Sequence, residues 1–245
     1  MNFLKNHPFG VEAFFKSSLV ITYAVPQQQL LPLLPPCLKP DTHNNQWGFV
    51  AAAMVSTHHL RPTGFPAFLG NSFFLIGYRI FVQYVNQQGR RLRGLYILGS
   101  ETDKKTMGIL GNVFTHYRYT TTDIVLEHST GHMLVKSQKS GLYVDADWND
   151  TDIPLPTGSP FADWKEARRF AGPLPFTFTY FNATKQVLII EGKRESWTPK
   201  PVKILHSKID FINQLGLTGI VPANAFIVEN IPYHWQKGVI EQWKP

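Results

Sequence analysis

A small set of ionisable and hydrogen-bonding side chains could form a ligand site in this sequence. Arg79, Arg118, Tyr117 and Glu101 are the candidate ligand-binding residues, and His116 is the candidate catalytic residue. Arginine offers a bidentate fork to a carboxylate, and histidine can donate or accept a proton near neutral pH. If Arg79, His116 and Arg118 converge, their positive charge suits a small carboxylate. We therefore expect the ligand to be a small anionic molecule.

A structural role for the same residues stays open. The two arginines could lie at the rim of the fold and make surface contacts, and His116 could be a strand histidine whose ring nitrogens are satisfied. His116 and Arg118 fall on one face of a predicted strand that continues into apolar Ile124 and Leu126. Such a face is typical of a half-buried polar cluster. The sequence supports the pocket and the rim equally.

A lysine pair in the same region raises the question of amine chemistry. Ser100 and Asp103 have the Ser-x-x-acid spacing of a helix start, and Lys104 and Lys105 follow them. Two adjacent lysines at the positive end of a helix can depress an amine pKa and make the amine nucleophilic. However, the phase of a helix running to about Asn112 turns both lysines away from its apolar side. We expect both amines to be solvated.

Metal and cofactor chemistry lack the expected ligand spacing. His58 and His59 point to opposite faces of a predicted strand, and His128 and His132 flank a turn without acidic or cysteine ligands at diagnostic spacing. The glycine-rich loops of nucleotide-binding proteins are absent, as are the Gly-x-Ser-x-Gly and Ser-x-x-Lys motifs of hydrolases. We expect no metal and no cofactor.

The composition is that of an ordinary globular protein with an excess of basic residues. Of 245 residues, 43% are hydrophobic and 17% are charged, and the formal net charge is +7. This charge favours anionic partners without identifying them. The arginines cluster only at Arg90, Arg91 and Arg93, at a predicted hairpin tip where we expect them to be solvated. No nucleic-acid-binding motif accompanies them, so nucleic acid is not an expected partner.

Cysteine usage and the first residues bear on the compartment. Cys37 is the single cysteine and cannot form an intramolecular disulfide. Lys5 and His7 stand where a secretory signal would have an apolar core, and no apolar run approaches 18 residues. We expect a cytoplasmic protein with no membrane partner. A homo-oligomer is compatible with the sequence.

Alternating apolar residues predict a chain made mainly of strands. The strands expected in the first half are residues 17–25, 47–59, 73–85, 92–99 and 115–128. Later strands form two predicted hairpins with short turns, one of residues 132–138 and 142–147 and the other of residues 176–181 and 186–195. Short helices are expected after Pro26, after Ser100 and at 161–170. No break in composition divides the chain, so we expect a single domain over residues 1–245.

Several short motifs mark the first half of the chain. They are Leu30-Leu31-Pro32-Leu33-Leu34-Pro35-Pro36, Ser72-Phe73-Phe74, Tyr78-Arg79 and Gly94-Leu95-Tyr96. Together with the order of the strands, they resemble the acetoacetate-decarboxylase-like superfamily, and more closely its uncharacterised bacterial branch. The likeness covers about residues 15 to 128 and continues loosely to Tyr233-His234-Trp235.

This resemblance implies a mainly β fold: a cone-shaped, largely antiparallel β-barrel with helices outside and an internal cavity. In the decarboxylases a lysine forms a Schiff base, and a neighbouring lysine lowers its pKa. The matching segment here, residues 112–116, contains no lysine, and the strand at 73–85 lacks the carboxylate that the decarboxylases carry there. The resemblance thus implies a barrel without the Schiff-base lysine.

The leading hypothesis is a small-molecule-binding barrel, and the sequence leaves open whether it is an enzyme. An enzyme of this kind would act on an oxo acid or another small carbonyl or carboxylate compound without a lysine Schiff base. The alternative is a non-catalytic ligand-binding or scaffold protein. An acetoacetate-type decarboxylase is the least favoured function.

Overall fold

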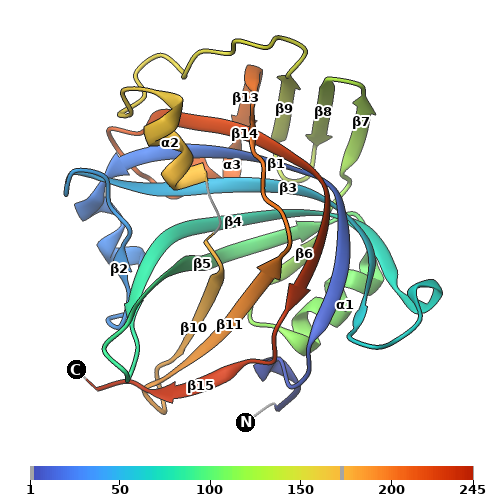
Figure 1. Ribbon diagram of the computed structural model, residues 1–245, viewed down its shortest axis with the longest axis vertical. Helices are drawn as coiled ribbons and strands as arrows, with labels where there is room; N and C mark the ends of the chain where they lie inside the picture. Colours follow the sequence, from blue (N-terminus) through green and yellow to red (C-terminus); the bar gives the residue numbers. More distant parts are fainter. Residues whose placement is uncertain (1–2, 172–173, 245) are drawn as a thin grey trace.

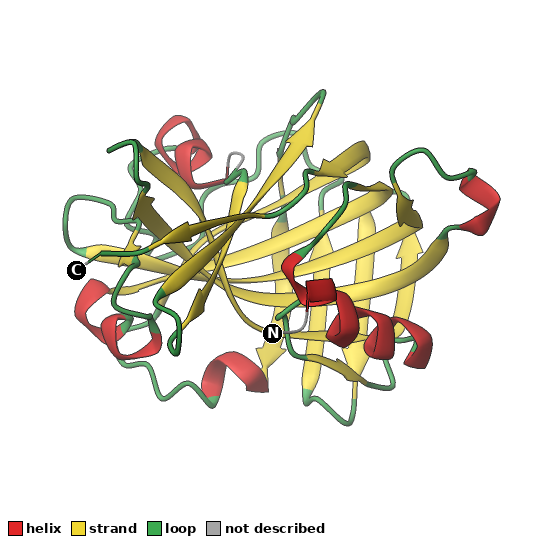
Figure 2. Ribbon diagram, turned by 90° about the horizontal axis from the view of Figure 1, so that it is seen from below, coloured by secondary structure: helices red, strands yellow, loops and turns green. Residues whose placement is uncertain are grey.

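The computed structural model describes residues 3–171 and 174–244, most of which form strands (Figure 1). The helices are short and lie around the strands (Figure 2). The predicted mainly β class is therefore confirmed. Within the described residues, no helix has the length and apolar character needed to cross a membrane.

Seven long strands form a ring of pairings. They are β1 (Val11–Pro26), β3 (Trp47–Pro62), β4 (Asn71–Val85), β5 (Arg91–Thr102), β10 (Phe176–Phe181), β11 (Gln186–Arg194) and β14 (Val221–Trp235). Their order is β14-β1-β3-β4-β5-β10-β11, and residues 192–194 of β11 pair again with residues 233–235 of β14. The sheet is largely antiparallel, but β5 pairs in parallel with β10 and with β6 (Tyr119–Thr121).

Shorter elements extend this arrangement. The large sheet also includes β2 (Lys39–Pro40), β12 (Lys200–Pro201) and β15 (Val239–Gln242). A second antiparallel sheet has the order β13 (Lys203–Ile209), β9 (Leu142–Asp147), β8 (His132–Ser137) and β7 (Val125–Ser129). The helices are α1 (Lys105–Phe114), α2 (Trp164–Ala171) and α3 (Asp210–Asn213), with 3₁₀ turns η1 (Phe3–Asn6), η2 (Gln27–Gln29), η3 (Leu31–Leu33) and η4 (Ala67–Leu69).

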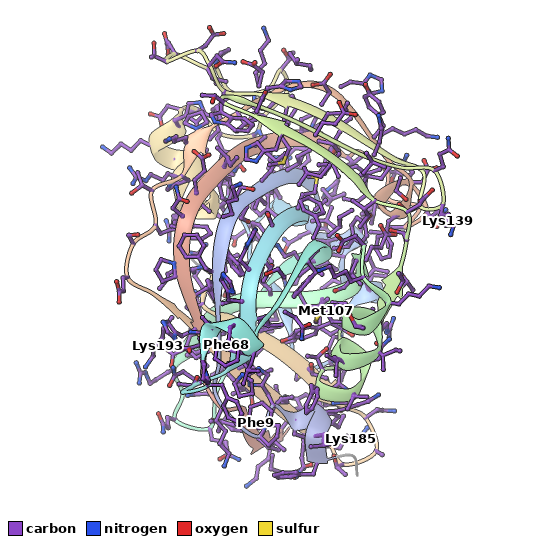
Figure 3. All side chains as sticks on the ribbon, turned by 90° about the vertical axis from the view of Figure 1, so that its right-hand side faces the viewer. Phe9, Phe68, Met107, Lys139, Lys185 and Lys193 are labelled. Atoms are coloured by element: carbon purple, nitrogen blue, oxygen red, sulfur yellow. The ribbon has the colours of Figure 1, made fainter. Side chains whose placement is uncertain are left out.

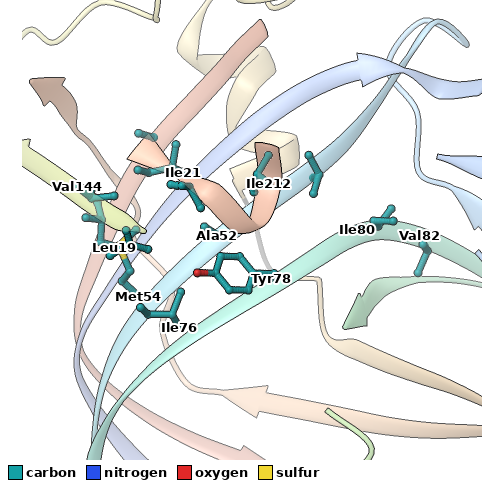
Figure 4. Packing of buried hydrophobic residues seen from close by; sticks show 14 of the residues in the cluster. Leu19, Ile21, Ala52, Met54, Ile76, Tyr78, Ile80, Val82, Val144 and Ile212 are labelled. Atoms are coloured by element: carbon teal, nitrogen blue, oxygen red, sulfur yellow. The ribbon is translucent and has the colours of Figure 1, made fainter. Parts of the chain in front are cut away.

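The two faces of the large sheet pack into two separate cores. On the outer face, Tyr78 and Ile76 of β4 pack with Val144 of the small sheet and Ile212 of α3 (Figure 4). On the inner face, Phe49 packs against Phe170 with ring centroids 4.5 Å apart. Each buried aromatic side chain stabilises the fold by about 1.5–3 kcal/mol. Strand β4 separates the two cores because its side chains alternate between the faces.

Two local predictions were wrong, both around α1. Strand β5 continues through Thr102, so Ser100 is a strand residue that pairs with Gly77, and α1 begins only at Lys105. Pairing with the neighbouring strand therefore outweighs the local helix-start signal at Ser100. The strand predicted at 115–128 is also replaced: residues 115–118 form a turn in which Arg118 has φ 53°, and β6 and β7 follow as separate short strands. His116 and Arg118 therefore do not share a strand face.

Candidate functional site

A cavity of about 150 Å³ lies inside the ring of strands. Every strand of the ring contributes lining residues, from Phe15 of β1 to Tyr233 of β14. The lining is mainly apolar and aromatic. A cavity of about this volume is large enough for a molecule the size of benzene. The ring thus encloses space for a small molecule.

Two arginines enter this cavity from different strands. Arg79 lies on β4 and Arg194 ends β11, and both line the cavity. Their Nε and Nη2 atoms, respectively, are buried without a hydrogen-bond partner among the described residues. None of the described residues that line the cavity is Asp, Glu or Lys. The cavity therefore carries positive charge that no lining carboxylate neutralises.

The pKa values reflect this burial. Burial lowers the pKa of Arg79 to about 10, and the charge of Arg194 acts in the same direction. Arg79 is half-buried and lines the cavity. Burial also lowers the pKa of Arg194. Both guanidinium groups nevertheless stay charged at neutral pH, because the arginine side chain is not deprotonated in proteins under these conditions.

Aromatic rings hold Arg194 in place. Its Cζ lies 4.2 Å from the ring centroid of Trp197 and 5.4 Å from that of Tyr233. Tyr233 in turn stacks on Phe15 at 4.8 Å. Burial raises the pKa of Tyr233, and the nearby charges of Arg194 and Arg79 partly oppose this effect. A cation over aromatic rings is attracted to them, but its N–H groups stay available to a ligand.

The wall beside Arg79 is built from small residues. Gly77 precedes Arg79 by two positions on the same face of β4, and its partner on β3 is Ala53. A Cβ atom added at Gly77 would meet no heavy atom within 4 Å. Glycine inside a strand weakens the strand and often marks the close approach of another group. Here it leaves open space next to the arginine.

Only two of the predicted site residues meet in this cavity: Arg79 and Tyr117 both line it. His116 and Arg118 line a separate pocket of about 280 Å³ that also contains Lys5. The predicted convergence of Arg79, His116 and Arg118 is not what the structure shows, because the turn at residues 115–118 carries His116 and Arg118 away from it.

Glu101 lies on the outer face of the large sheet, away from Arg79. It pairs with Ile76, and the Tyr78 hydroxyl donates a hydrogen bond to its Oε2 at 3.1 Å. Burial raises the pKa of Glu101, and the neighbouring hydroxyl groups of Ser140 and Tyr78 oppose this rise. Glu101 therefore belongs to the packing against the small sheet and does not neutralise the cavity arginines.

Lys104 and Lys105 are exposed, as their helical phase predicts. The histidines suggested by the sequence also lie apart: His132 Nε2 is 2.7 Å from Asp145 Oδ1, and His128 packs by Trp148. Among residues 3–171 and 174–244, no three His, Cys, Asp or Glu side chains gather as metal ligands would. The arginine cavity brings Arg79, Arg194 and Tyr117 together.

Sequence reasoning missed Arg194 and Tyr233. Residues 186–195 were predicted as a strand, but a strand pattern does not show which other strand its end will meet. The pairing of Arg194 with Tyr233, far apart in sequence, is what places the arginine at the cavity. The available signal was a basic residue in phase with apolar Leu188 and Ile190 of the same strand.

Comparison with known proteins agrees with this fold. An acetoacetate decarboxylase from Legionella pneumophila is similar with a TM-score of 0.60 and 12% identity, covering 94% of this chain and 86% of that one. An acetoacetate decarboxylase-like enzyme from Sphingomonas wittichii RW1 has a TM-score of 0.60 at 12% identity, with coverage of 97% and 93%. The enduracididine biosynthesis enzyme MppR, complexed with pyruvate, has a TM-score of 0.57 at 12% identity, with coverage of 97% and 92%.

The sequence itself matches no curated protein. It matches the DUF2071 family, described as "Uncharacterized conserved protein (COG2071)", over residues 13–236. The structural neighbours have the same fold as this chain, as the sequence motifs suggested. The chain therefore belongs to the DUF2071 family and has the acetoacetate-decarboxylase-like fold.

Proposed function

We propose that the protein is an enzyme that binds a small 2-oxo acid in the arginine cavity. The observation that carries this proposal is the presence of Arg79 and Arg194 in one cavity whose described lining contains no carboxylate. A buried charge without a partner is costly, and a carboxylate ligand would offset that cost with charge-assisted hydrogen bonds. The ligand would supply the missing counter-charge.

The size of the cavity and one structural neighbour support this ligand class. A cavity of about 150 Å³ suits a molecule of about six non-hydrogen atoms, which is the size of pyruvate. The MppR enzyme, which shares the fold, has been seen complexed with pyruvate. A similar fold does not establish a similar ligand, so the proposal depends on the arginines of this chain.

The groups around the cavity favour stabilisation of an enolate. Burial raises the pKa values of Tyr117 and Tyr233, so both phenols stay protonated at neutral pH and can donate hydrogen bonds. Donors and guanidinium groups fixed in a dry site stabilise negative charge that develops on a substrate oxygen. Transfer of a proton from C3 of pyruvate to a solvent molecule creates such a charge on the carbonyl oxygen. The described lining offers no lysine for a Schiff base.

Thermal shifts with an acid and its neutral amide test the binding site. Pyruvate at about one hundred times its Kd should stabilise the wild type by about 2.7 kcal/mol, whereas pyruvamide should have little effect. Arg79→Met and Arg194→Met should lose this response. Arg118→Met is the matched control, because Arg118 is exposed and does not line the cavity. Equal responses to acid and amide, or full responses in both cavity variants, would contradict the proposed site.

Proton exchange separates an enzyme from a binding protein. If the cavity stabilises the enolate, the wild type should accelerate exchange of the C3 protons of pyruvate into deuterium oxide, followed by nuclear magnetic resonance. The two cavity variants should not. A protein that is stabilised by pyruvate but exchanges no protons and converts no oxo acid is instead the non-catalytic ligand-binding protein of the alternative hypothesis.

A further inference from the structure

An apolar pocket of about 210 Å³ adjoins the arginine cavity. It lies between α1, the segment before β1, and the ends of β1, β3 and β4. Its apolar lining includes Phe9, Leu60, Met107, Leu110 and Phe114. Met107 lies on the side of α1 that faces the strands (Figure 3) and is buried. We refer to this space as the α1 pocket.

The α1 pocket and the arginine cavity share a junction. Five side chains line both spaces: Phe15, Leu75, Tyr117, Tyr119 and Trp235. The two spaces therefore meet at one layer of side chains, most of them aromatic. On one side of the junction lie Arg79 and Arg194, and on the other side the lining is almost entirely apolar.

The α1 pocket leaves apolar surface uncovered. Phe9 is 39% exposed and Leu110 is 38% exposed, although both border a pocket whose lining is mostly apolar. Phe9 and Phe114 already contact each other at a ring distance of 5.8 Å, so they form a preassembled aromatic wall. Apolar pockets with a few polar groups at one end are typical of small-molecule sites.

We propose that the ligand is a 2-oxo acid with an aryl or branched alkyl substituent, whose carboxylate binds at Arg79 and Arg194 and whose substituent occupies the α1 pocket. This inference rests on the proposed function and specifies its substrate class. Charge decides the orientation, because Arg79 and Arg194 line the inner end without a carboxylate, whereas Arg61, which lines the α1 pocket, is already paired with Glu12 at 2.7 Å. The volumes of the two spaces determine which part of the ligand each can hold. The arginine cavity suits the oxo-acid group, and the larger α1 pocket suits a phenyl ring.

A series of acids of increasing apolar length tests this assignment by isothermal titration calorimetry. The series runs from pyruvate through 2-oxobutanoate and 2-oxopentanoate to 2-oxo-4-phenylbutanoate. Each buried methylene should tighten binding by about threefold to fourfold. The aryl acid should bind at least about tenfold more tightly than pyruvate, with a more negative heat-capacity change because it buries more apolar surface.

Leu110→Gln tests the α1 pocket itself. The substitution places an amide in the apolar wall, so it should lower the affinity for the aryl acid several-fold and leave pyruvate affinity unchanged. Ile109→Gln is the matched control, because Ile109 is the neighbouring helix residue, is 66% exposed and does not line the pocket. Its two affinities should equal those of the wild type. Leu110 is exposed enough that the variant should fold.

The outcomes separate this inference from the proposed function. If pyruvate binds through Arg79 but affinity does not rise along the series, the α1 pocket assignment is overturned and the oxo-acid site stands. If neither pyruvate nor the aryl acid binds, the proposed function fails as well. If Leu110→Gln and Ile109→Gln lose the same affinity for the aryl acid, the inference is overturned. It is also overturned if the aryl acid binds Arg79→Met as tightly as the wild type. Should Leu110→Gln not fold, the wild-type series alone decides.

Discussion

Replacing Arg79 with methionine should stabilise the ligand-free protein. Methionine keeps a similar length and apolar stem but removes a cation whose Nε has no hydrogen-bond partner within residues 3–171 and 174–244. The fall of the Arg79 pKa from its ordinary value to about 10 means that folding disfavours the charged form of Arg79 by roughly 3 kcal/mol. Because part of Arg79 still faces open space in the cavity, we expect a gain of about 1 to 3 kcal/mol.

Thermal and urea unfolding measure this gain. For a chain of this length, it should raise Tm by roughly 2 to 12 °C. The pKa of Arg79 is lowered, so its charged form destabilises the fold at every pH below about 10, and the penalty disappears only as the pH rises through that value. The gain should therefore be constant between pH 6 and 9.

Arg118→Met is the control for this prediction, because an exposed arginine outside the cavity should change stability by no more than about 0.5 kcal/mol. The same Arg79→Met protein should lose its response to pyruvate. This combination of higher stability and lost binding is typical of a functional residue. If Arg79→Met is destabilised by 1 kcal/mol or more while Arg118→Met is unchanged, then Arg79 is a structural residue and the reasoning is refuted.

Three further substitutions probe the surroundings of the site. Gly77→Val should fill the open space beside Arg79 and abolish pyruvate binding. Tm should stay unchanged or rise, because the new Cβ meets no heavy atom within 4 Å. If a folded variant binds pyruvate normally by calorimetry, the position of the site is contradicted. Glu101→Gln should raise Tm at pH 7, because the raised pKa of Glu101 makes its ionised form unfavourable in the folded protein. The difference in Tm between the variant and the wild type should shrink as the pH falls toward 4. A lower Tm of the variant at pH 7 would show that the fold needs the carboxylate. Arg93→Met should lower the free energy of unfolding, measured by urea denaturation, by about 1 to 3 kcal/mol. The reason is that it removes the guanidinium that lies 2.6 Å from the carboxylate of buried Asp41. No change in the free energy of unfolding would show that other groups satisfy Asp41.

The sequence predicted the parts of the site that depend on local periodicity. Alternation along residues 73–85 places Arg79 and Tyr78 on opposite faces of one strand, and the structure has them there. Helical phase likewise turns Lys104 and Lys105 to the outside. These features depend on residues a few positions apart, which a single sequence displays directly.

The features that the sequence missed depend on pairing between distant segments. Ser100 carries a helix-start signal, but its backbone is held by pairing with Gly77 on one side and Tyr119 on the other, so β5 continues past it. Arg194 reaches the cavity only because its strand meets the end of β14. No local sequence pattern predicts either contact.

Other errors came from exposed segments. Strand β13 was not predicted because most of its residues are exposed, so it lacks the apolar alternation that marks a half-buried strand. Arg93 was expected at a solvated hairpin tip but pairs with Asp41 and lies 5.4 Å from the Phe170 ring. In both cases contacts with distant segments, and not the local sequence pattern, determine the structure that is observed.

A crystal structure of the protein soaked with pyruvate tests the central claim most directly. The carboxylate oxygens should lie about 2.7 to 2.9 Å from guanidinium nitrogens of Arg79 or Arg194, next to Gly77. The same soak of Arg79→Met should show no ligand in the cavity. A carboxylate bound instead in the pocket of Lys5, His116 and Arg118, with the arginine cavity holding only water, would contradict the claim.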